Sequence, residues 1–294
     1  MQNLYENCTL CPRKCGVNRL KGEVGFCGAN ANVEVNRIGL HFMEEPIISG
    51  TDGSGTVFFT HCSLGCIFCQ NKDISRKGSS GKEYTAEQLA KEYINLENQG
   101  AHNINLVTPT HYMPTVVQSI KIAREMGIKI PFVYNTSGFE QYENIKMLEG
   151  VIDIFLTDLK YFSPYLAGRY SGSEDYFDNC LPAINEMVKI TGAPTYHENG
   201  MLKKGTIIRH LILPGAVGDT ISILRQTEKH FGDRVLVSLM RQYTPMSNTL
   251  PDELCRTVTD DEYTQAVDEF NALNLNGFLQ QSDSVGKDKI PEFK

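Results

Sequence analysis

The sequence predicts an α/β fold: a partial, TIM-like (β/α)6 barrel behind a cysteine-rich N-terminal segment. From about residue 56 onward, strand and helix patterns alternate in about six β-then-α units, which indicates a parallel sheet with helices outside it. Six units joined by right-handed crossovers favour an open, partial barrel over a closed barrel of eight. A flat, doubly wound sheet is the alternative, but the glycine-rich phosphate-binding motifs of nucleotide-binding sheets do not occur.

Length and composition are those of an ordinary globular protein. The 294 residues carry 28 Lys and Arg against 35 Asp and Glu, a net charge of −7, so nothing indicates global binding to nucleic acid or to a membrane surface. No apolar run approaches bilayer length, and the N-terminus lacks the features of a signal peptide. We therefore expect a cytoplasmic protein with a metal-binding extension over residues 1–50 and a barrel over residues 51–294.

In the first half of the barrel, the sequence marks where several strands and helices begin and end. A short apolar run follows the turn signal at residues 52–55, and Thr85 with Gln88 forms a capping box for a helix that Gly100 ends. These patterns predict strands over residues 57–60, 103–108 and 129–136, and helices over residues 85–99, 114–126 and 140–149.

The second half repeats the alternation. The continuous apolar run within residues 152–160 is typical of a strand buried on both faces. Asp219 is expected to be the N-cap residue of one helix. Thr259 and Glu262 are expected to form a capping box at the start of another. The predicted strands are residues 152–160, 207–213, 235–240 and 277–281, and the predicted helices are residues 176–190, 219–231 and 259–273.

Seven of the nine cysteines lie in the first quarter of the chain, where metal ligation is a likelier role than disulfide bonding in a reducing compartment. Cys62, Cys66 and Cys69 form C-x3-C-x2-C directly after the first barrel strand, where parallel folds place chemistry. Three thiolates can hold three irons of a [4Fe–4S] cluster and leave the fourth open to a small molecule. The alternatives are a zinc site, for which His61 is badly placed beside Cys62, and three unligated buried cysteines.

The C-x3-C-x2-C motif, with Phe68 before its last cysteine, resembles that of the radical S-adenosylmethionine (SAM) superfamily. The following Gln70-Asn71 resembles the activating-enzyme branch, and the likeness extends over most of residues 56–250. The resemblance implies a [4Fe–4S] cluster whose open iron chelates SAM and whose electron cleaves it to a 5′-deoxyadenosyl radical. It also implies an electron donor of the flavodoxin or ferredoxin type.

The resemblance assigns SAM-binding roles at two strand ends. Thr108 and Thr110 occupy the position at which the family usually has Gly-Gly-Glu, which binds the SAM amino group. Asn135 and Thr136 match the aspartate and threonine of an Asp-Thr-Asn-Gly stretch in pyruvate formate-lyase-activating enzymes, although an ordinary turn also explains this segment. His111 is expected either on the rim of the site or at the surface.

Charged residues end the next two strands. Asp158 and Lys160 share one face of a strand and match the Leu-Asp-Leu-Lys of activating enzymes, which implies contact with SAM; a structural ion pair is the alternative. Arg209 matches the family's Arg-x-x-x-x-Pro-Gly and would meet the SAM carboxylate. Gln242 and Tyr243 follow the sixth strand and are expected at a substrate cleft.

The other four clustered cysteines are Cys8, Cys11, Cys15 and Cys27, within a glycine-rich segment. Four thiolates complete a coordination shell. The four cysteines therefore fit either a structural Zn²⁺ or a second iron–sulfur cluster, and we slightly prefer zinc. The stretch over residues 11–16 resembles a divergent, pyruvate formate-lyase-activating enzyme-like branch.

The function implied by the resemblance is reductive cleavage of SAM followed by hydrogen abstraction, with a glycyl radical enzyme as the candidate partner. Radical modification of another peptide, RNA or a small molecule is the alternative within enzymes, and the net charge of −7 argues mildly against RNA. If the protein is not an enzyme, the alternative is a non-catalytic metal-binding scaffold.

Overall fold

The computed structural model describes residues 3–76, 78–280 and 293. One sheet forms its centre, with strand order β10-β9-β8-β6-β5-β4-β2-β1-β3, and β7 pairs with β8 beside it. The strands are β1 (Val33–His41), β2 (Ser54–Phe59), β3 (Lys82–Tyr84), β4 (Ile104–Val107), β5 (Phe132–Thr136), β6 (Ile154–Asp158), β7 (Thr195–Tyr196), β8 (Leu202–Leu211), β9 (Leu236–Met240) and β10 (Gly277–Leu279).

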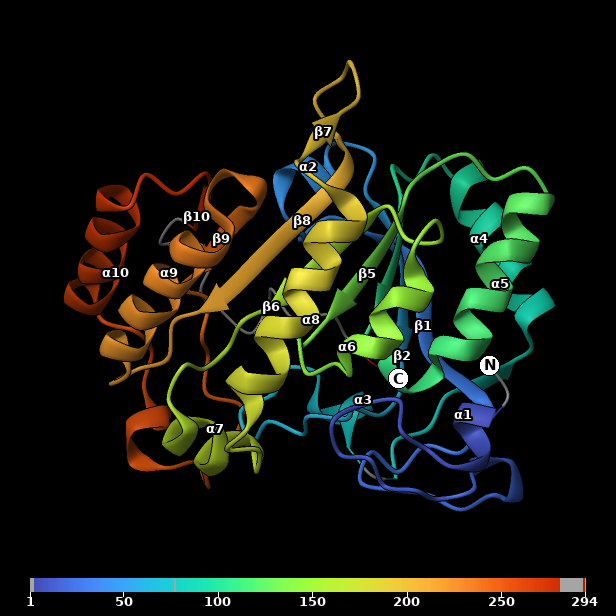
Figure 1. The fold of residues 1–294 in the computed structure, drawn as a ribbon, viewed down its shortest axis with the longest axis horizontal. Helices are drawn as coiled ribbons and strands as arrows, with labels where there is room; N and C mark the ends of the chain where they lie inside the picture. The colour runs from blue at the N-terminus through green and yellow to red at the C-terminus, as the bar shows by residue number, and fades with distance from the viewer. Residues whose placement is uncertain (1–2, 77, 281–292, 294) are drawn as a thin grey trace.

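Helices cover the outer face of this sheet (Figure 1). The capping boxes at Thr85 and Thr259 start two of them, as the sequence predicts. The helices are α1 (Asn3–Glu6), α2 (Pro46–Ser49), α3 (Lys72–Ser75), α4 (Ala86–Asn98), α5 (Met113–Glu125), α6 (Tyr142–Ile145), α7 (Pro164–Ser171), α8 (Tyr176–Thr191), α9 (Val217–Phe231) and α10 (Asp260–Ala272).

The predicted partial barrel is confirmed. Every pairing along the path from β2 through β4, β5, β6, β8 and β9 to β10 is parallel, whereas β1 pairs antiparallel with both β2 and β3. Every residue of β2, β4, β5, β6 and β9 is buried, as expected for strands covered on both faces. Among the described residues the two edge strands, β10 and β3, do not pair with each other, so the barrel stays open.

Some local features differ from the predictions. Strand β1 joins the sheet within residues 1–50, where the sequence analysis predicts only a metal-binding extension; Val33 and Val35, two positions apart, are its buried residues at that end. The helix expected over residues 140–149 divides into α6 and a 3-10 turn. Asp219 does not cap α9, because its carboxylate accepts the backbone N–H groups of residues 162 and 163. The strand predicted over residues 277–281 is present as β10, and residue 281 lies outside the described residues.

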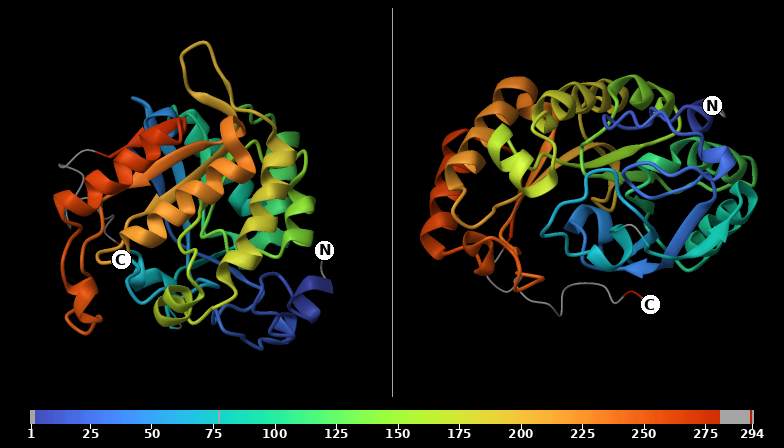
Figure 2. Two further views of the ribbon diagram at one scale, coloured as in Figure 1. Left: turned by 60° about the vertical axis from the view of Figure 1, so that its left-hand side comes forward. Right: turned by 90° about the horizontal axis from the view of Figure 1, so that it is seen from below.

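The two ends of the barrel carry different segments. Figure 1 shows α1, α3 and α7 at its lower end, where the arrow of β8 points, and α2 with β7 at its upper end. Seen from below in Figure 2, the N-terminal segment and the loop after β2 lie over this same lower end. Ile48 of α2 is buried in one apolar cluster with Val133, Ile154 and Leu202, which lie at or near the starts of β5, β6 and β8. The N-terminal residues therefore cover the amino end with α2 and reach the carboxyl end with the loop after α1.

Among the described residues, no helix combines the length and the apolar character needed to cross a lipid bilayer.

Candidate active site

A cavity of about 200 Å³ opens at the carboxyl ends of the parallel strands. The loop after β2 and the ends of β4, β5, β6, β8 and β9 form its wall, which is where parallel α/β proteins place chemistry. Most of the residues singled out in the sequence meet here: Cys62, Cys66, Cys69, Thr108, Asn135, Thr136, Asp158, Lys160, Arg209, Gln242 and Tyr243.

Each cysteine of the C-x3-C-x2-C loop accepts a hydrogen bond at sulfur. The Leu64 N–H donates to Cys62 Sγ at 3.4 Å, and the Ser75 hydroxyl donates to Cys69 Sγ at 3.4 Å. The Ser171 hydroxyl, from the end of α7, donates to Cys66 Sγ at 3.1 Å. Such donors stabilise thiolates, which are the form that binds metal.

The three thiols need positive charge to ionise together. Burial, and then the neighbouring Cys66 and Cys69 thiols, raises the pKa of Cys62 to about 12. Iron would supply the compensating charge, because a metal deprotonates a coordinating thiol outright. Among the described residues that line the cavity, these three are the only cysteines, so a cluster held here would keep one iron without a protein thiolate. The residues present therefore fit a [4Fe–4S] cluster.

Unusual backbone conformations position this loop. His61 and Thr108, at the ends of the neighbouring strands β2 and β4, have φ of 70° and 61°, in the left-handed region that residues other than glycine rarely adopt. Strain of this kind persists where surrounding contacts hold it, commonly at functional sites. The His61 N–H donates to the carbonyl oxygen of Ile74 at 2.6 Å, and the Thr108 N–H donates to that of Asn135 at 2.8 Å. Arg76, from the loop after α3, holds the cysteine loop itself by donating to the carbonyl oxygens of Gly65 and Cys66.

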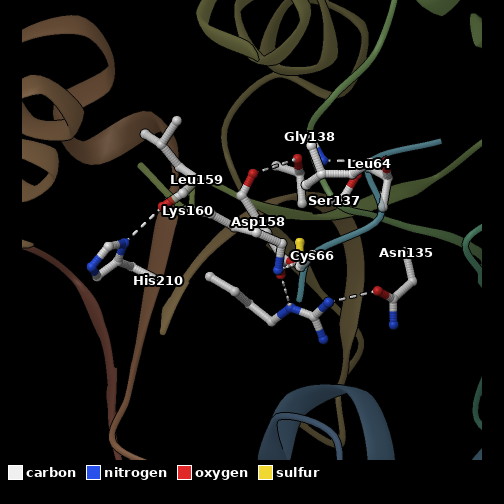
Figure 3. A network of polar contacts seen from close by, with 12 residues as sticks. Leu64, Cys66, Asn135, Ser137, Gly138, Asp158, Leu159, Lys160 and His210 are labelled. Atoms are coloured by element: carbon white, nitrogen blue, oxygen red, sulfur yellow. Dashed lines mark hydrogen bonds and ion pairs between the residues drawn. The ribbon is translucent and has the colours of Figure 1, made fainter. Parts of the chain in front are cut away.

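A charged network forms the other side of the cavity. Arg209 Nε donates to Asp158 Oδ1 at 2.9 Å, and Lys160 Nζ donates to Asp158 Oδ2 at 2.5 Å. Arg209 Nη2 also donates to Asn135 Oδ1 at 2.6 Å. Figure 3 shows Asp158, Lys160 and Cys66 close together, with Asn135 across the network. Burial alone would raise the pKa of the Asp158 carboxyl, but Arg209 and Lys160 outweigh burial and lower it, so Asp158 is an anion.

Glu44 completes this network, and no sequence pattern pointed to it. Its carboxylate accepts from Arg209 Nη1 at 3.2 Å and from the side-chain amides of Asn105 at 3.0 Å and Asn135 at 3.3 Å. Glu44 lies two residues before α2, so the segment that covers the amino end of the barrel also places a carboxylate in the charged network of the cavity. Ser75 and Ser171 were likewise missed as donors to the cysteines.

Thr110 lies outside the cavity, unlike Thr136. The hydroxyls of both donate to the buried carboxyl of Glu140, and Thr110 is absent from the cavity wall among the described residues. Burial raises the pKa of Glu140 to about 7, so this carboxyl keeps its proton at mildly acidic pH and loses it above neutral pH. His111 is neither at the rim nor at the surface: it is 2% exposed and its Nε2 contacts the carbonyl oxygen of Thr60 at 2.8 Å.

The four N-terminal cysteines lie in the loop between α1 and β1, away from the cavity wall. Cys8 and Cys11 are buried, Cys27 is partly buried and Cys15 is exposed. Within residues 3–76, 78–280 and 293, no group of three or more His, Cys, Asp or Glu side chains is arranged to hold a metal ion. A [4Fe–4S] cluster makes a different demand, because each cysteine binds a different iron and the sulfurs need not converge on one point.

Comparisons with known proteins agree with this geometry. An uncharacterised protein of Methanocaldococcus jannaschii is 29% identical over 288 residues, covering 94% of this chain and 77% of that protein. A pyruvate formate-lyase-activating enzyme of Staphylococcus epidermidis is 22% identical over 209 residues, covering 64% and 74%. The structure of Streptococcus suis SuiB bound to S-adenosylmethionine superposes with a TM-score of 0.53 at 14% identity, covering 76% of this chain and 48% of SuiB, which shows a shared fold.

A model of the Radical SAM superfamily matches residues 56–215, more than half of the chain. The matched stretch begins in β2, includes the three cavity cysteines and ends just after β8, so it contains most of the cavity wall. By this match, the chain belongs to the Radical SAM superfamily.

Proposed function

We propose that this protein cleaves SAM reductively at a [4Fe–4S] cluster held by Cys62, Cys66 and Cys69, and uses the cleavage to abstract a hydrogen atom from a polypeptide. The observation that carries the proposal is one cavity with three hydrogen-bonded thiols and no fourth cysteine among its described lining residues, faced by Asp158, Lys160 and Arg209. A closed structural metal site would instead surround its ion with four protein ligands.

When bound and reduced, the cluster would supply one electron that breaks the sulfonium C–S bond of SAM, releasing methionine and a 5′-deoxyadenosyl radical. The chain's residues prepare the site for this. The Leu64 N–H and the Ser75 and Ser171 hydroxyls hold the three sulfurs in place. Orienting donors of this kind also tune the metal they surround.

The charged network suits the amino-acid end of SAM, which carries an ammonium and a carboxylate. Asp158 can accept from the ammonium, and Arg209 can donate to the carboxylate with its planar fork. Arg209 is already bonded to Asp158, Glu44 and Asn135, so a SAM carboxylate would exchange with one of these partners. Asn135 or Glu44 is the expected one, because Asp158 also binds Lys160.

The proposed substrate is a polypeptide, with a glycyl radical enzyme as the specific candidate. This part is supported by the sequence relation to a pyruvate formate-lyase-activating enzyme, and by the shared fold with SuiB, whose structure with the precursor peptide SuiA is known. Reduction would come from a flavodoxin- or ferredoxin-type donor. The proposal includes a cytoplasmic location, where cysteines stay reduced.

The first test uses protein purified and reconstituted without oxygen, reduced with dithionite and supplied with SAM. We expect 5′-deoxyadenosine and methionine in equal amounts, and no product from Cys62→Ala. Cys255→Ala is the matched control, because this exposed thiol lies outside both cysteine loops. Iron-loaded protein that forms no product, while a known radical SAM enzyme turns over beside it, would favour a non-catalytic scaffold and overturn the proposal.

The substrate is tested by isotope transfer. Candidate glycyl radical enzymes with deuterated glycine would be incubated with the reduced protein and SAM. Deuterium in 5′-deoxyadenosine is the expected result, whereas product without deuterium in the presence of every candidate would move the search to RNA or small molecules.

A further inference from the structure

The loop over residues 8–28 brings four cysteines together that the proposed function does not use. The Cys8 N–H donates to the carbonyl oxygen of Val17 at 3.1 Å, and the Gly16 N–H donates back to that of Cys8 at 3.0 Å. This pairing places Cys8 beside Cys15, which directly precedes Gly16. The Lys14 N–H bonds the carbonyl oxygen of Cys11 at 3.0 Å, which turns the chain between Cys11 and Cys15.

Cys27, the last of the four cysteines, lies near Cys15 because the backbone just before it passes close to the Cys15 sulfur. The Phe26 N–H donates to Cys15 Sγ at 3.3 Å. Gly25 passes so close that a Cβ there would lie 2.6 Å from Cys15 Sγ, a contact that no larger residue could make. Cys27 directly follows Phe26, so the same backbone approach brings Cys27 to the part of the loop that holds Cys15. The four thiols therefore belong to one site, bounded by backbone that donates to sulfur.

The two cysteine loops hold their sulfur atoms in a similar way. The Phe26 N–H donates to Cys15 Sγ at 3.3 Å, as the Leu64 N–H donates to Cys62 Sγ at 3.4 Å in the loop that fits a [4Fe–4S] cluster. Hydrogen bonds to sulfur are among the features that set the properties of iron–sulfur clusters, whose irons each take a separate cysteine. A structural zinc ion would take the four thiolates in a tetrahedron about one centre, and the metal count distinguishes the two.

A single arginine ties this loop to the catalytic one. Arg13, between Cys11 and Cys15, donates to the carbonyl oxygens of Ser63 at 3.3 Å and Leu64 at 3.2 Å, which lie between the first two cavity cysteines. It also donates to the carbonyl oxygen of Ser171 at 2.8 Å. The hydroxyl of that same Ser171 donates to Cys66 Sγ.

Aromatic contacts hold this arginine in place. The Arg13 guanidinium lies 3.9 Å from the ring centre of Phe26, the residue whose N–H bonds Cys15. The packing of Phe26 therefore depends on how the N-terminal loop is folded, and with it the position of Arg13.

We propose that Cys8, Cys11, Cys15 and Cys27 hold a second [4Fe–4S] cluster, and that Arg13 transmits the folded state of this loop to the loop of the catalytic cluster. With four protein thiolates this second cluster has no open iron and does not bind SAM. Arg13 is a positioning residue: it touches the backbone around the cavity cysteines and not the reacting atoms.

The site is tested with a variant in which Cys62, Cys66 and Cys69 are all changed to Ala. After reconstitution without oxygen it should retain about four irons and about four sulfides per chain, against about eight of each in the unaltered protein. Its reduced electron paramagnetic resonance spectrum should not change when SAM is added. The converse variant, Cys8→Ala with Cys11→Ala, should keep about four irons and a spectrum that SAM shifts.

One zinc and no iron in the triple variant would overturn the second cluster. If that variant does not fold, the unaltered protein decides alone: about four irons with one zinc contradicts the inference, and about eight irons supports it. These counts are separate from the proposed function, because a protein with two clusters and no 5′-deoxyadenosine would keep this inference and lose that proposal.

The coupling is tested with Arg13→Lys and Arg13→Gln. Lysine keeps the charge, but it cannot reach several carbonyl oxygens with a planar fork. Both variants should keep their iron, show a shifted spectrum of the SAM-bound catalytic cluster, and bind SAM about tenfold more weakly, which is about 1.4 kcal/mol. Arg225→Gln, at a surface ion pair with Glu269, is the control. An unchanged spectrum and SAM affinity in Arg13→Gln would overturn the coupling.

Discussion

The two cysteine loops lie at the same end of the barrel and differ in what surrounds their sulfur atoms (Figures 1 and 2). The loop with Cys62, Cys66 and Cys69 opens onto a cavity whose far side carries Asp158, Lys160 and Arg209. The loop with the four N-terminal cysteines is absent from that wall among the described residues, and hydrogen bonds of its own backbone hold its shape.

Under the two proposals, the cysteine thiolate would serve two purposes in this protein. Three thiolates beside charged side chains leave room for a small molecule at the fourth iron, whereas four thiolates complete the coordination by themselves. The charged network supplies what the missing cysteine does not: groups able to recognise the amino-acid end of a ligand. The following changes test this contrast, beginning with the largest expected effect.

The largest difference between the two loops is expected when one cavity cysteine is removed and SAM cleavage is measured. Cys66→Ala should lower 5′-deoxyadenosine formation at least about a thousandfold, or about 4 kcal/mol in activation free energy, because the catalytic cluster loses one of its three ligands. Cys11→Ala, in the other loop, should leave SAM cleavage detectable. The measurement is product formation per iron, and equal losses in the two variants would mean that the loops do not differ in role.

The charged side of the cavity should be the next most sensitive. Asp158→Asn leaves Lys160 and Arg209 without their shared buried anion, and breaking a buried ion pair in this way costs about 3 kcal/mol of unfolding free energy. Glu269→Gln breaks an exposed pair with Arg225 and should lower the free energy of unfolding far less, because solvent screens this pair. Denaturant unfolding of both variants measures this, and similar costs would show that the network is not a buried one.

Glu140 allows a pH test of the region between the loops, because Thr110 and Thr136 both donate to its carboxyl. Burial raises the pKa of this carboxyl from 4.5 to about 7 in the folded protein. The folded state therefore holds a proton that the unfolded chain releases, and stability falls as pH rises between these two values. The loss should be about 2 kcal/mol from about pH 5 to about pH 7.5.

The matched variant is Glu140→Gln, which cannot titrate. Urea unfolding at both pH values should show that the part of the pH dependence due to this residue disappears in the variant. A variant with the same pH dependence as the unaltered protein would place the titrating group elsewhere.

The smallest expected effect concerns the N-terminal loop alone. Gly25→Ala would push a methyl group onto Cys15 Sγ, and forced contacts of this size cost about 1 to 3 kcal/mol. Gly39→Ala, in β1, meets nothing within 4 Å and is the control. Iron retention after gel filtration should fall at the N-terminal site of Gly25→Ala only. Loss of catalytic-site iron instead would place the strain in the other loop.

Much of the fold and part of the site followed from short-range patterns. The capping boxes at Thr85 and Thr259 start helices as expected, because a cap joins residues three positions apart. Cys62, Cys66 and Cys69 lie in a single loop, so their spacing alone predicts that they share one site, and all three line the cavity. Asp158 and Arg209 were predicted one by one at the ends of two strands, and parallel pairing of β6 with β8 brings them together.

The contacts that complete the site could not be predicted in this way. Glu44 reaches Arg209 from 165 residues away, and Arg13 reaches Gly172 from 159 residues away. Neither residue stands in a pattern of its own, because a carboxylate or a guanidinium acquires its role only from the atoms that the folded chain places beside it.

By itself, the sequence determined the alternation of strands and helices, the two groups of cysteines and the residues at the strand ends, since each depends on neighbours along the chain. The tertiary structure decided that Thr110 points to Glu140 and not into the cavity. It also decided that Glu44 joins the charged network and that Arg13 links the two cysteine loops. These outcomes depend on which distant segments pack together, and packing is set by the burial of the whole chain, not by local preference.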